Sequence, residues 1–68
     1  MKNKSNKWIN FDDFIKLKTD DRLKIRFMNG IAIVQKILSD NEIVVIFEGG
    51  CWNNKEINII RHQVNKIY

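Results

Sequence analysis

Several residue types and patterns that would assign this chain to a particular class of protein are scarce or missing. The sequence contains no proline and one cysteine, Cys51. A single cysteine excludes an intramolecular disulfide and a metal cage of several cysteines, so apolar packing must supply the stability of the fold. No apolar run approaches the roughly 18 to 20 residues of a membrane-spanning helix, and MKNKSNK leads into no hydrophobic segment of a secretory signal. We therefore expect a cytoplasmic protein.

Length and charge limit the organisation of the chain. Its 68 residues are enough for one small domain and too few for two. The formal charge is +4, but Lys2, Lys4 and Lys7 stand in the first seven residues without an acidic residue among them. The other nine basic residues face eight acidic ones, which leaves the rest of the chain at +1. We expect a flexible basic tail over residues 1–7, which either lies along phosphates or aids solubility, and a single domain over residues 8–68.

An apolar pattern with helical spacing near the N-terminus predicts one short helix. Asn10 stands where an N-cap belongs, and Asp12 and Asp13 place negative charge in the first turn, where the helix dipole favours it. The apolar positions of the pattern are Trp8, Phe11, Phe14 and Ile15. We expect the helix at about residues 11–17.

Residues 22–27 alternate basic and apolar side chains, a pattern typical of a half-buried strand. The apolar positions are Leu23, Ile25 and Phe27, and the basic positions are Arg22, Lys24 and Arg26. Asn29-Gly30 follows, a pair typical of type I′ hairpin turns, in which both central residues have positive φ. The pattern predicts a hairpin with its basic side toward solvent.

Four more strands are expected along the rest of the chain. Residues 31–38 return from the turn, the polar SDNE reverses the chain near residues 40–41, and IVVIF, apolar on both faces, is the best candidate for the central strand. KEINIIR predicts the fourth strand, RHQ a short corner and VNKIY the last strand. The expected core lies on the apolar phase of these strands: Leu23, Ile25, Phe27, Val34, Val45, Phe47, Ile57 and Ile59.

The order of these segments resembles the SH3-like small barrels, including the Tudor-type and KOW-type modules. The resemblance covers about residues 20 to 68 and is carried by RLKIRF, NGIAIV, EIVVIFE and INIIRHQVNKI in that order. It implies a mainly β fold, a five-stranded SH3-like barrel made of a meander of four strands, a one-turn corner and a short closing strand. The N-terminal helix is an addition to that pattern.

Few residues are suited to catalysis. His62 and Cys51 are the candidates for chemistry near neutral pH, and we expect them on the far sides of one strand, too distant to act as a pair. The adjacent aspartates at 12–13 and 20–21 do not converge on one helix face, and the three glycines match no nucleotide-binding motif. We expect a protein that is not an enzyme and carries no cofactor or metal.

The segment EGGCWNN, residues 48–54, places a tryptophan between turn-forming residues. Gly49-Gly50 is well suited to a β-bulge, and one extra residue there decides whether Trp52 points outward or closes the end of the core. The sequence leaves both alternatives open. We expect Trp52 to be partly exposed and within reach of Arg26 or Lys55.

Two classes of partner fit this pattern, and nucleic acid is the first. Arg22, Lys24 and Arg26 would space positive charges about 6.6 to 7 Å apart along one strand, close to the phosphate repeat of an extended single strand. Trp52 would offer a face for base stacking. The predicted nucleic-acid-binding residues are Arg22, Lys24, Arg26, Lys36, Trp52, Lys55 and Arg61. The alternative for the basic positions is that they only solvate an exposed sheet face.

The second class of partner is protein. Apart from its first seven residues the chain is almost neutral, so it presents no uniform positive field to a nucleic acid. The exposed edge strands of a small barrel can also pair with a strand of a protein partner. In that interpretation the chain is a protein-interaction module, such as a phage-type inhibitor or adaptor that docks on a host protein.

Overall fold

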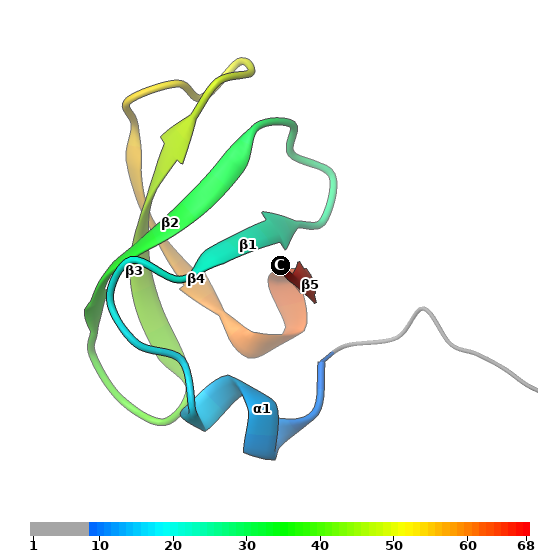
Figure 1. Cartoon of the computed structure of the whole chain (residues 1–68), viewed down its shortest axis with the longest axis vertical. Coiled ribbons are helices and arrows are strands. Elements are labelled where there is room, and N and C mark those ends of the chain that lie inside the picture. Colours follow the sequence, from blue (N-terminus) through cyan, green and yellow to red (C-terminus); the bar gives the residue numbers. More distant parts are fainter. Residues whose placement is uncertain (1–8) are drawn as a thin grey trace, which may run out of the picture.

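Five antiparallel strands form one sheet, and one short helix precedes them (Figure 1). The computed structural model describes residues 9–68, so the predicted tail over residues 1–7 and Trp8 lie outside the described residues. In chain order the elements are α1 (Phe11–Ile15), β1 (Arg22–Ile25), β2 (Ile31–Ile37), β3 (Glu42–Glu48), β4 (Glu56–Ile60), the 3-10 turn η1 (Arg61–Gln63) and β5 (Val64–Ile67).

The strands follow the order β4-β3-β2-β1-β5 across the sheet. Strands β1 to β4 form a meander, and η1 then returns the chain so that β5 pairs with β1. Within residues 9–68, β4 and β5 do not pair with each other, so the sheet is not closed. The prediction of a mainly β fold with five strands and a short N-terminal helix is confirmed. The sequence predicted IVVIF, which lies in β3, as the central strand, but the strand in the middle of the order is β2.

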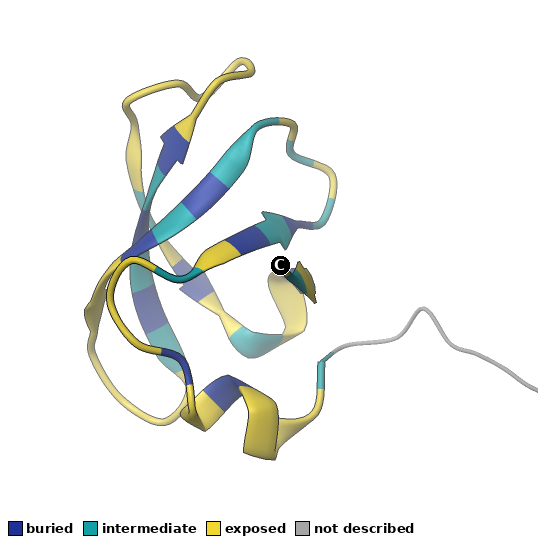
Figure 2. Ribbon diagram, viewed as in Figure 1, coloured by how far each residue is buried: buried dark blue, intermediate teal, exposed yellow. Residues whose placement is uncertain are grey.

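Helix α1 begins as its sequence predicts and ends earlier. The side chain of Asn10 accepts a hydrogen bond from the N–H of Asp12 at 3.1 Å, which caps the first turn. The helix ends at Ile15, two residues short of the prediction. Phe14 is 2% exposed and Leu17 is 7% exposed, so this segment contributes to the same core as the strands. Figure 2 shows the helix largely exposed, with a buried segment that belongs to Phe14.

The core lies on one side of the sheet, as the alternation of side chains requires. Along β3, buried and half-buried residues alternate over six positions, and β2 begins in the same way (Figure 2). Six of the predicted core residues are buried: Leu23, Ile25, Val34, Val45, Phe47 and Ile59. Five buried residues are additional: Phe14, Leu17, Ala32, Ile43 and Val64. Ile57, also predicted, is half-buried and packs against this core.

The prediction that Phe27 belongs to the core is wrong. Strand β1 ends at Ile25, and Phe27 stands in the following turn with φ 63° and a side chain that is 100% exposed. Met28 packs against the core instead, and its N–H donates to the carbonyl of Ile25 at 3.3 Å. The alternation of apolar and basic residues continues in the sequence to Phe27, but the strand ends two residues earlier, at Ile25. Alternation predicts the buried side only within a strand, so it does not apply to Phe27.

The predicted type I′ turn at Asn29-Gly30 is also wrong. Gly30 has φ 90°, but Asn29 is not among the residues with positive φ, whereas both central residues of a type I′ turn need it. The connection between β1 and β2 is a five-residue loop, residues 26–30, in which Phe27 and Gly30 adopt the positive angles.

Phe47 and Phe27 allow one substitution to be compared at two extremes of burial. We expect Phe47→Ala to lower the free energy of unfolding by about 3 to 5 kcal/mol, because it empties a site that is 1% exposed. Phe27→Ala should leave it unchanged to within about 0.5 kcal/mol, since the ring has no burial to lose. Urea titration followed by circular dichroism measures both. Equal losses in the two variants would contradict the end of β1 at Ile25.

Candidate binding site at the paired loops

Two loops that are distant in sequence lock together at one end of the sheet. They are residues 26–30, between β1 and β2, and residues 49–55, between β3 and β4, called here the paired loops. The side-chain oxygen of Asn29 accepts a hydrogen bond from the N–H of Cys51 at 3.0 Å. A Cβ atom on Gly30 would stand 2.3 Å from the carbonyl oxygen of Gly49, and one on Gly50 would stand 2.7 Å from the backbone of Asn29. The contact therefore requires glycine at both positions.

The second of the paired loops is also held by its own hydrogen bonds. The side chain of Asn53 accepts from the N–H of Gly49 at 2.7 Å, and the N–H of Asn54 donates to the carbonyl of Phe47 at 2.7 Å. The N–H of Lys55 donates to the carbonyl of Trp52 at 2.8 Å. These bonds fix the tip of the loop, where Trp52 stands.

The double glycine in this loop does not form the predicted bulge. β3 ends at Glu48, and the irregularities of strand register fall elsewhere, between β1 and β5 and between β2 and β3. Gly49 and Gly50 instead supply two successive positive φ angles, 82° and 74°, as the chain leaves the strand. The glycines of EGGCWNN are therefore needed for the exit from β3 and for the close approach of Gly50 to Asn29.

The paired loops carry two exposed aromatic side chains. Trp52 is 42% exposed, as predicted, and Phe27 is fully exposed. Phe27 is two residues from Asn29 and Trp52 is next to Cys51, so the hydrogen bond between those two residues ties the aromatic positions to one structural unit. A bulky residue with positive φ is uncommon, and such strain tends to gather at functional sites. Sequence reasoning missed Phe27 because it assigned the ring to the core.

Arg22 and Lys24 lie on the side of β1 opposite the core, as predicted, but each already has a partner. Nη1 of Arg22 is 3.0 Å from a carboxylate oxygen of Glu48. Nζ of Lys24 donates to the carbonyl of Ile25 at 3.2 Å and to the carbonyl of Met28. A phosphate at this strand would have to compete with these contacts.

Arg26 and Arg61 are used in part to join segments of the fold. Arg26 follows the last residue of β1, is half-buried, and its N–H donates to the carbonyl of Gln63 at 2.8 Å. Nη1 of Arg61 donates to the carbonyl of Ile9 at 3.1 Å, and its guanidinium lies 5.9 Å from the centre of the Phe11 ring. Arg61 thus connects η1 to the start of α1.

The remaining predicted cations are exposed and lie in different places. Lys55 closes the second of the paired loops, three residues after Trp52. Lys36 lies in β2 opposite Val44, on the side of the sheet away from the core. Of the seven predicted residues, the structure brings Arg26, Trp52 and Lys55 to the paired loops and distributes the others over β1, β2 and η1.

Cys51 and His62 stand at opposite ends of β4, since one precedes the strand in the paired loops and the other follows it in η1. Cys51 is a free, exposed thiol. In residues 9–68 no group of three or more histidine, cysteine or acidic side chains is arranged to hold a metal ion. No helix in that part of the chain is both long enough and apolar enough to span a membrane.

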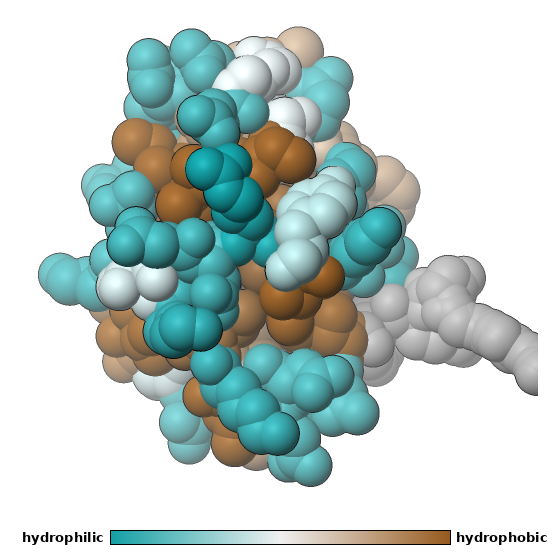
Figure 3. All heavy atoms as spheres, viewed as in Figure 1, coloured by the Kyte–Doolittle hydropathy of each residue, from teal (hydrophilic) through white to brown (hydrophobic). Residues whose placement is uncertain are grey.

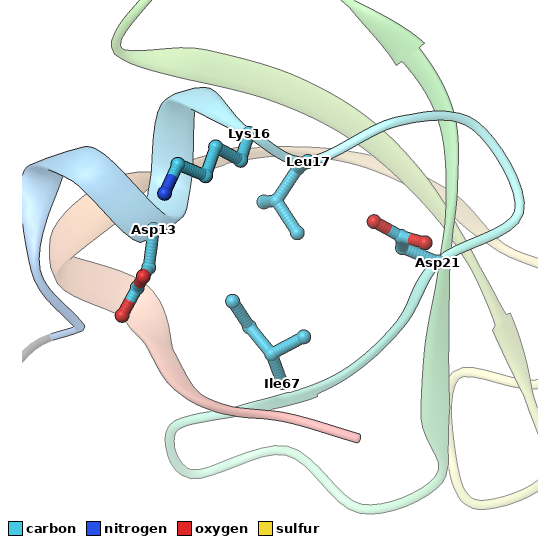
Figure 4. Close-up of a pocket in the computed structure, with 5 residues that line it drawn as sticks. All are labelled: Asp13, Lys16, Leu17, Asp21 and Ile67. Atoms are coloured by element: carbon cyan, nitrogen blue, oxygen red, sulfur yellow. The ribbon is translucent and has the colours of Figure 1, made fainter.

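A shallow pocket of about 330 Å³ opens where the segment after α1 approaches the end of β5 (Figure 4). Leu17 and Ile67 form its apolar part, and Asp13, Lys16 and Asp21 stand around it. Asp21 is committed to the turn before β1, because its carboxylate accepts from the N–H of Lys18 at 3.1 Å and pairs with the Lys18 ammonium at 3.4 Å. The sequence did not indicate this pocket, since its residues come from three separate segments.

The three glycines allow the contact between the paired loops to be tested. Gly30→Ala and Gly50→Ala should each lower the free energy of unfolding by at least about 2 kcal/mol, because the added Cβ meets backbone atoms and positive φ is strained. Gly49→Ala has open space around it and should cost only the strain of positive φ, about 1 to 2 kcal/mol. Urea titrations of the three variants provide the measurement. Equal losses at all three positions would argue against the close approach of the loops.

The paired loops are the candidate site of this chain, because they carry two exposed aromatic rings on backbone held by hydrogen bonds, with Arg26 and Lys55 at the ends of the loops. On the face drawn in Figure 3, apolar side chains reach the surface in several places with hydrophilic side chains between them.

Comparison of the chain with protein-family models, with curated proteins and with solved structures gave no significant match.

Proposed function

We propose that this chain is an SH3-like small barrel of the Tudor or KOW type that acts as a non-catalytic binding module for single-stranded nucleic acid. The fold assignment is supported by the meander of four strands, the one-turn corner η1 and the return of β5 to β1. The proposed partner is supported chiefly by one observation: two exposed aromatic side chains stand on loops that hold each other in place.

The chemistry of the paired loops suits an unpaired strand. Bases stack on exposed aromatic rings with little dependence on sequence, and each stacked base is worth about 1 to 3 kcal/mol. Trp52 and Phe27 would provide two such faces. Arg26 at the start of the first loop and Lys55 at the end of the second add positive charge for the phosphates between the bases.

The loops are a better place for phosphates than the strand face that the sequence suggested. On the strands, Glu42, Glu48 and Glu56 share the sheet face of Arg22, so phosphates there would meet carboxylates. The paired loops themselves contain no acidic residue; Glu48 and Glu56 flank the second loop, and Glu48 is paired with Arg22 at 3.0 Å. The proposed contact surface therefore moves from the side of β1 to the end of the sheet.

Binding of a fluorescein-labelled oligothymidylate, followed by fluorescence anisotropy, tests the proposal. Trp52→Ala and Phe27→Ala should each raise the Kd about 5- to 150-fold, the equivalent of one lost stacking contact. Tyr68→Ala is the matched control, because Tyr68 is an exposed aromatic residue whose N–H donates to Arg22 at the start of β1, outside the paired loops. It should bind like the wild type.

Thermal unfolding and salt dependence complete the test. Phe27→Ala should keep the thermal midpoint of the wild type, and the logarithm of the Kd should rise linearly with the logarithm of the salt concentration, as phosphate contacts require. Absence of oligonucleotide binding by the wild type at low salt would refute the proposed partner. Loss of binding in Tyr68→Ala equal to that in Trp52→Ala would refute the proposed surface.

A further inference from the structure

The face of the sheet opposite the core is itself partly apolar. Ile33 lies between buried Ala32 and Val34, and Ile46 lies between buried Val45 and Phe47, so both side chains point away from the core. Both are only half-buried, as is the rest of this outer row of β2 and β3 at Ile31 and Val44 (Figure 2). Leu38, which follows β2, is 45% exposed, and Ile60, the last residue of β4, is 40% exposed.

The charges on this face are separated by sign. Strand pairing aligns Arg22 with Ile33, Ile33 with Ile46, and Ile46 with Glu56, so one line across four strands reads positive, apolar, apolar, negative. Adjacent strands are about 4.8 Å apart, which puts the backbones of Arg22 and Glu56 about 14 Å from each other along this line. The basic side also holds Lys24, and Glu42 lies on the β3 side of the face next to β4.

We propose that this outer face binds a second copy of the same chain, face to face, about a two-fold axis that runs parallel to β2 and β3. Such an axis exchanges the two sides of the face. Arg22 of each copy then meets Glu56 of the other, and Ile33 meets Ile46. The line across the sheet is therefore complementary to itself in both charge and hydrophobicity, which is the requirement for an isologous dimer.

The alternative two-fold axis, perpendicular to the strands, is disfavoured by the same charges. It would place Arg22 against Arg22 and Glu56 against Glu56, and like charges across an interface are strongly unfavourable. The sequence pattern thus selects one orientation of the two copies.

The ion pair between Arg22 and Glu48 is compatible with this arrangement. Both side chains are more than half exposed, at 54% and 62%. A guanidinium has five N–H donors, so Arg22 can keep its bond to Glu48 and also donate to a carboxylate of the other copy. Glu56 is exposed and begins β4.

Sedimentation velocity of the whole chain over a range of concentrations tests the dimer. We expect a concentration-dependent shift from monomer to dimer for the wild type. Arg22→Glu and Glu56→Arg should each raise the dimerisation Kd on the order of a hundredfold, because each change opposes like charges at two symmetry-related positions. Lys16→Glu, an equal change of charge on the exposed residue that follows α1, should leave the Kd unchanged.

Mixing the two charge variants gives the decisive result. The Arg22→Glu variant has negative charge at both ends of the line across the sheet, and the Glu56→Arg variant has positive charge at both ends. An equimolar mixture should therefore form a heterodimer at a concentration at which each variant alone is monomeric. Circular dichroism checks that both variants are folded. A wild type that stays monomeric at every concentration overturns the proposal without any variant, and a mixture of the folded variants that fails to associate overturns the proposed axis. Oligonucleotide binding by Arg22→Glu is recorded separately, so failure of the dimer does not decide the function of the paired loops.

Discussion

Strand β1 is four residues long, yet it pairs on one side with β2 and on the other with β5. Strands β2, β3 and β4 pair with one another without β1, but β5 pairs with the sheet only through β1. Leu23 and Ile25, both with no exposed surface, bring the core side of β1 into contact with the rest of the buried cluster. Because β5 and the first of the paired loops are both attached to this strand, its two buried residues support the core and the candidate site together.

The periodicity of the sequence was sufficient to find the strands, since a period of two identifies which side of each strand is buried. Leu23, Val45, Phe47 and Ile59 follow that rule and are buried. The rule fails where a strand stops. Phe27 continues the alternation of β1 in the sequence but lies in a turn, and Ala32 was overlooked because a small side chain gives a weak signal although it is fully buried.

Contacts between distant segments account for most of what the sequence did not predict. Asn29 and Cys51 are 22 positions apart, so nothing in the local pattern of either loop indicates that they share a hydrogen bond. The ion pair of Arg22 was missed for the same reason. The basic positions of β1 alone predicted that Arg22 was available to bind phosphate, whereas its partner Glu48 is 26 positions away, on a strand that does not pair with β1. A basic row on one strand therefore says little about the electrostatic character of the assembled face.

The paired loops stand at one end of the strands rather than on a side of the sheet, and this position has a consequence for avidity. A two-fold axis parallel to β2 and β3 leaves the ends of the strands unexchanged, so both copies in the proposed dimer would present their loops in the same direction. A ligand long enough to touch both would meet the second pair at a high effective concentration, on the order of millimolar for a short flexible connection. Weak stacking at each Trp52 could then give tight overall binding, with a minimum ligand length set by the distance between the two loop pairs.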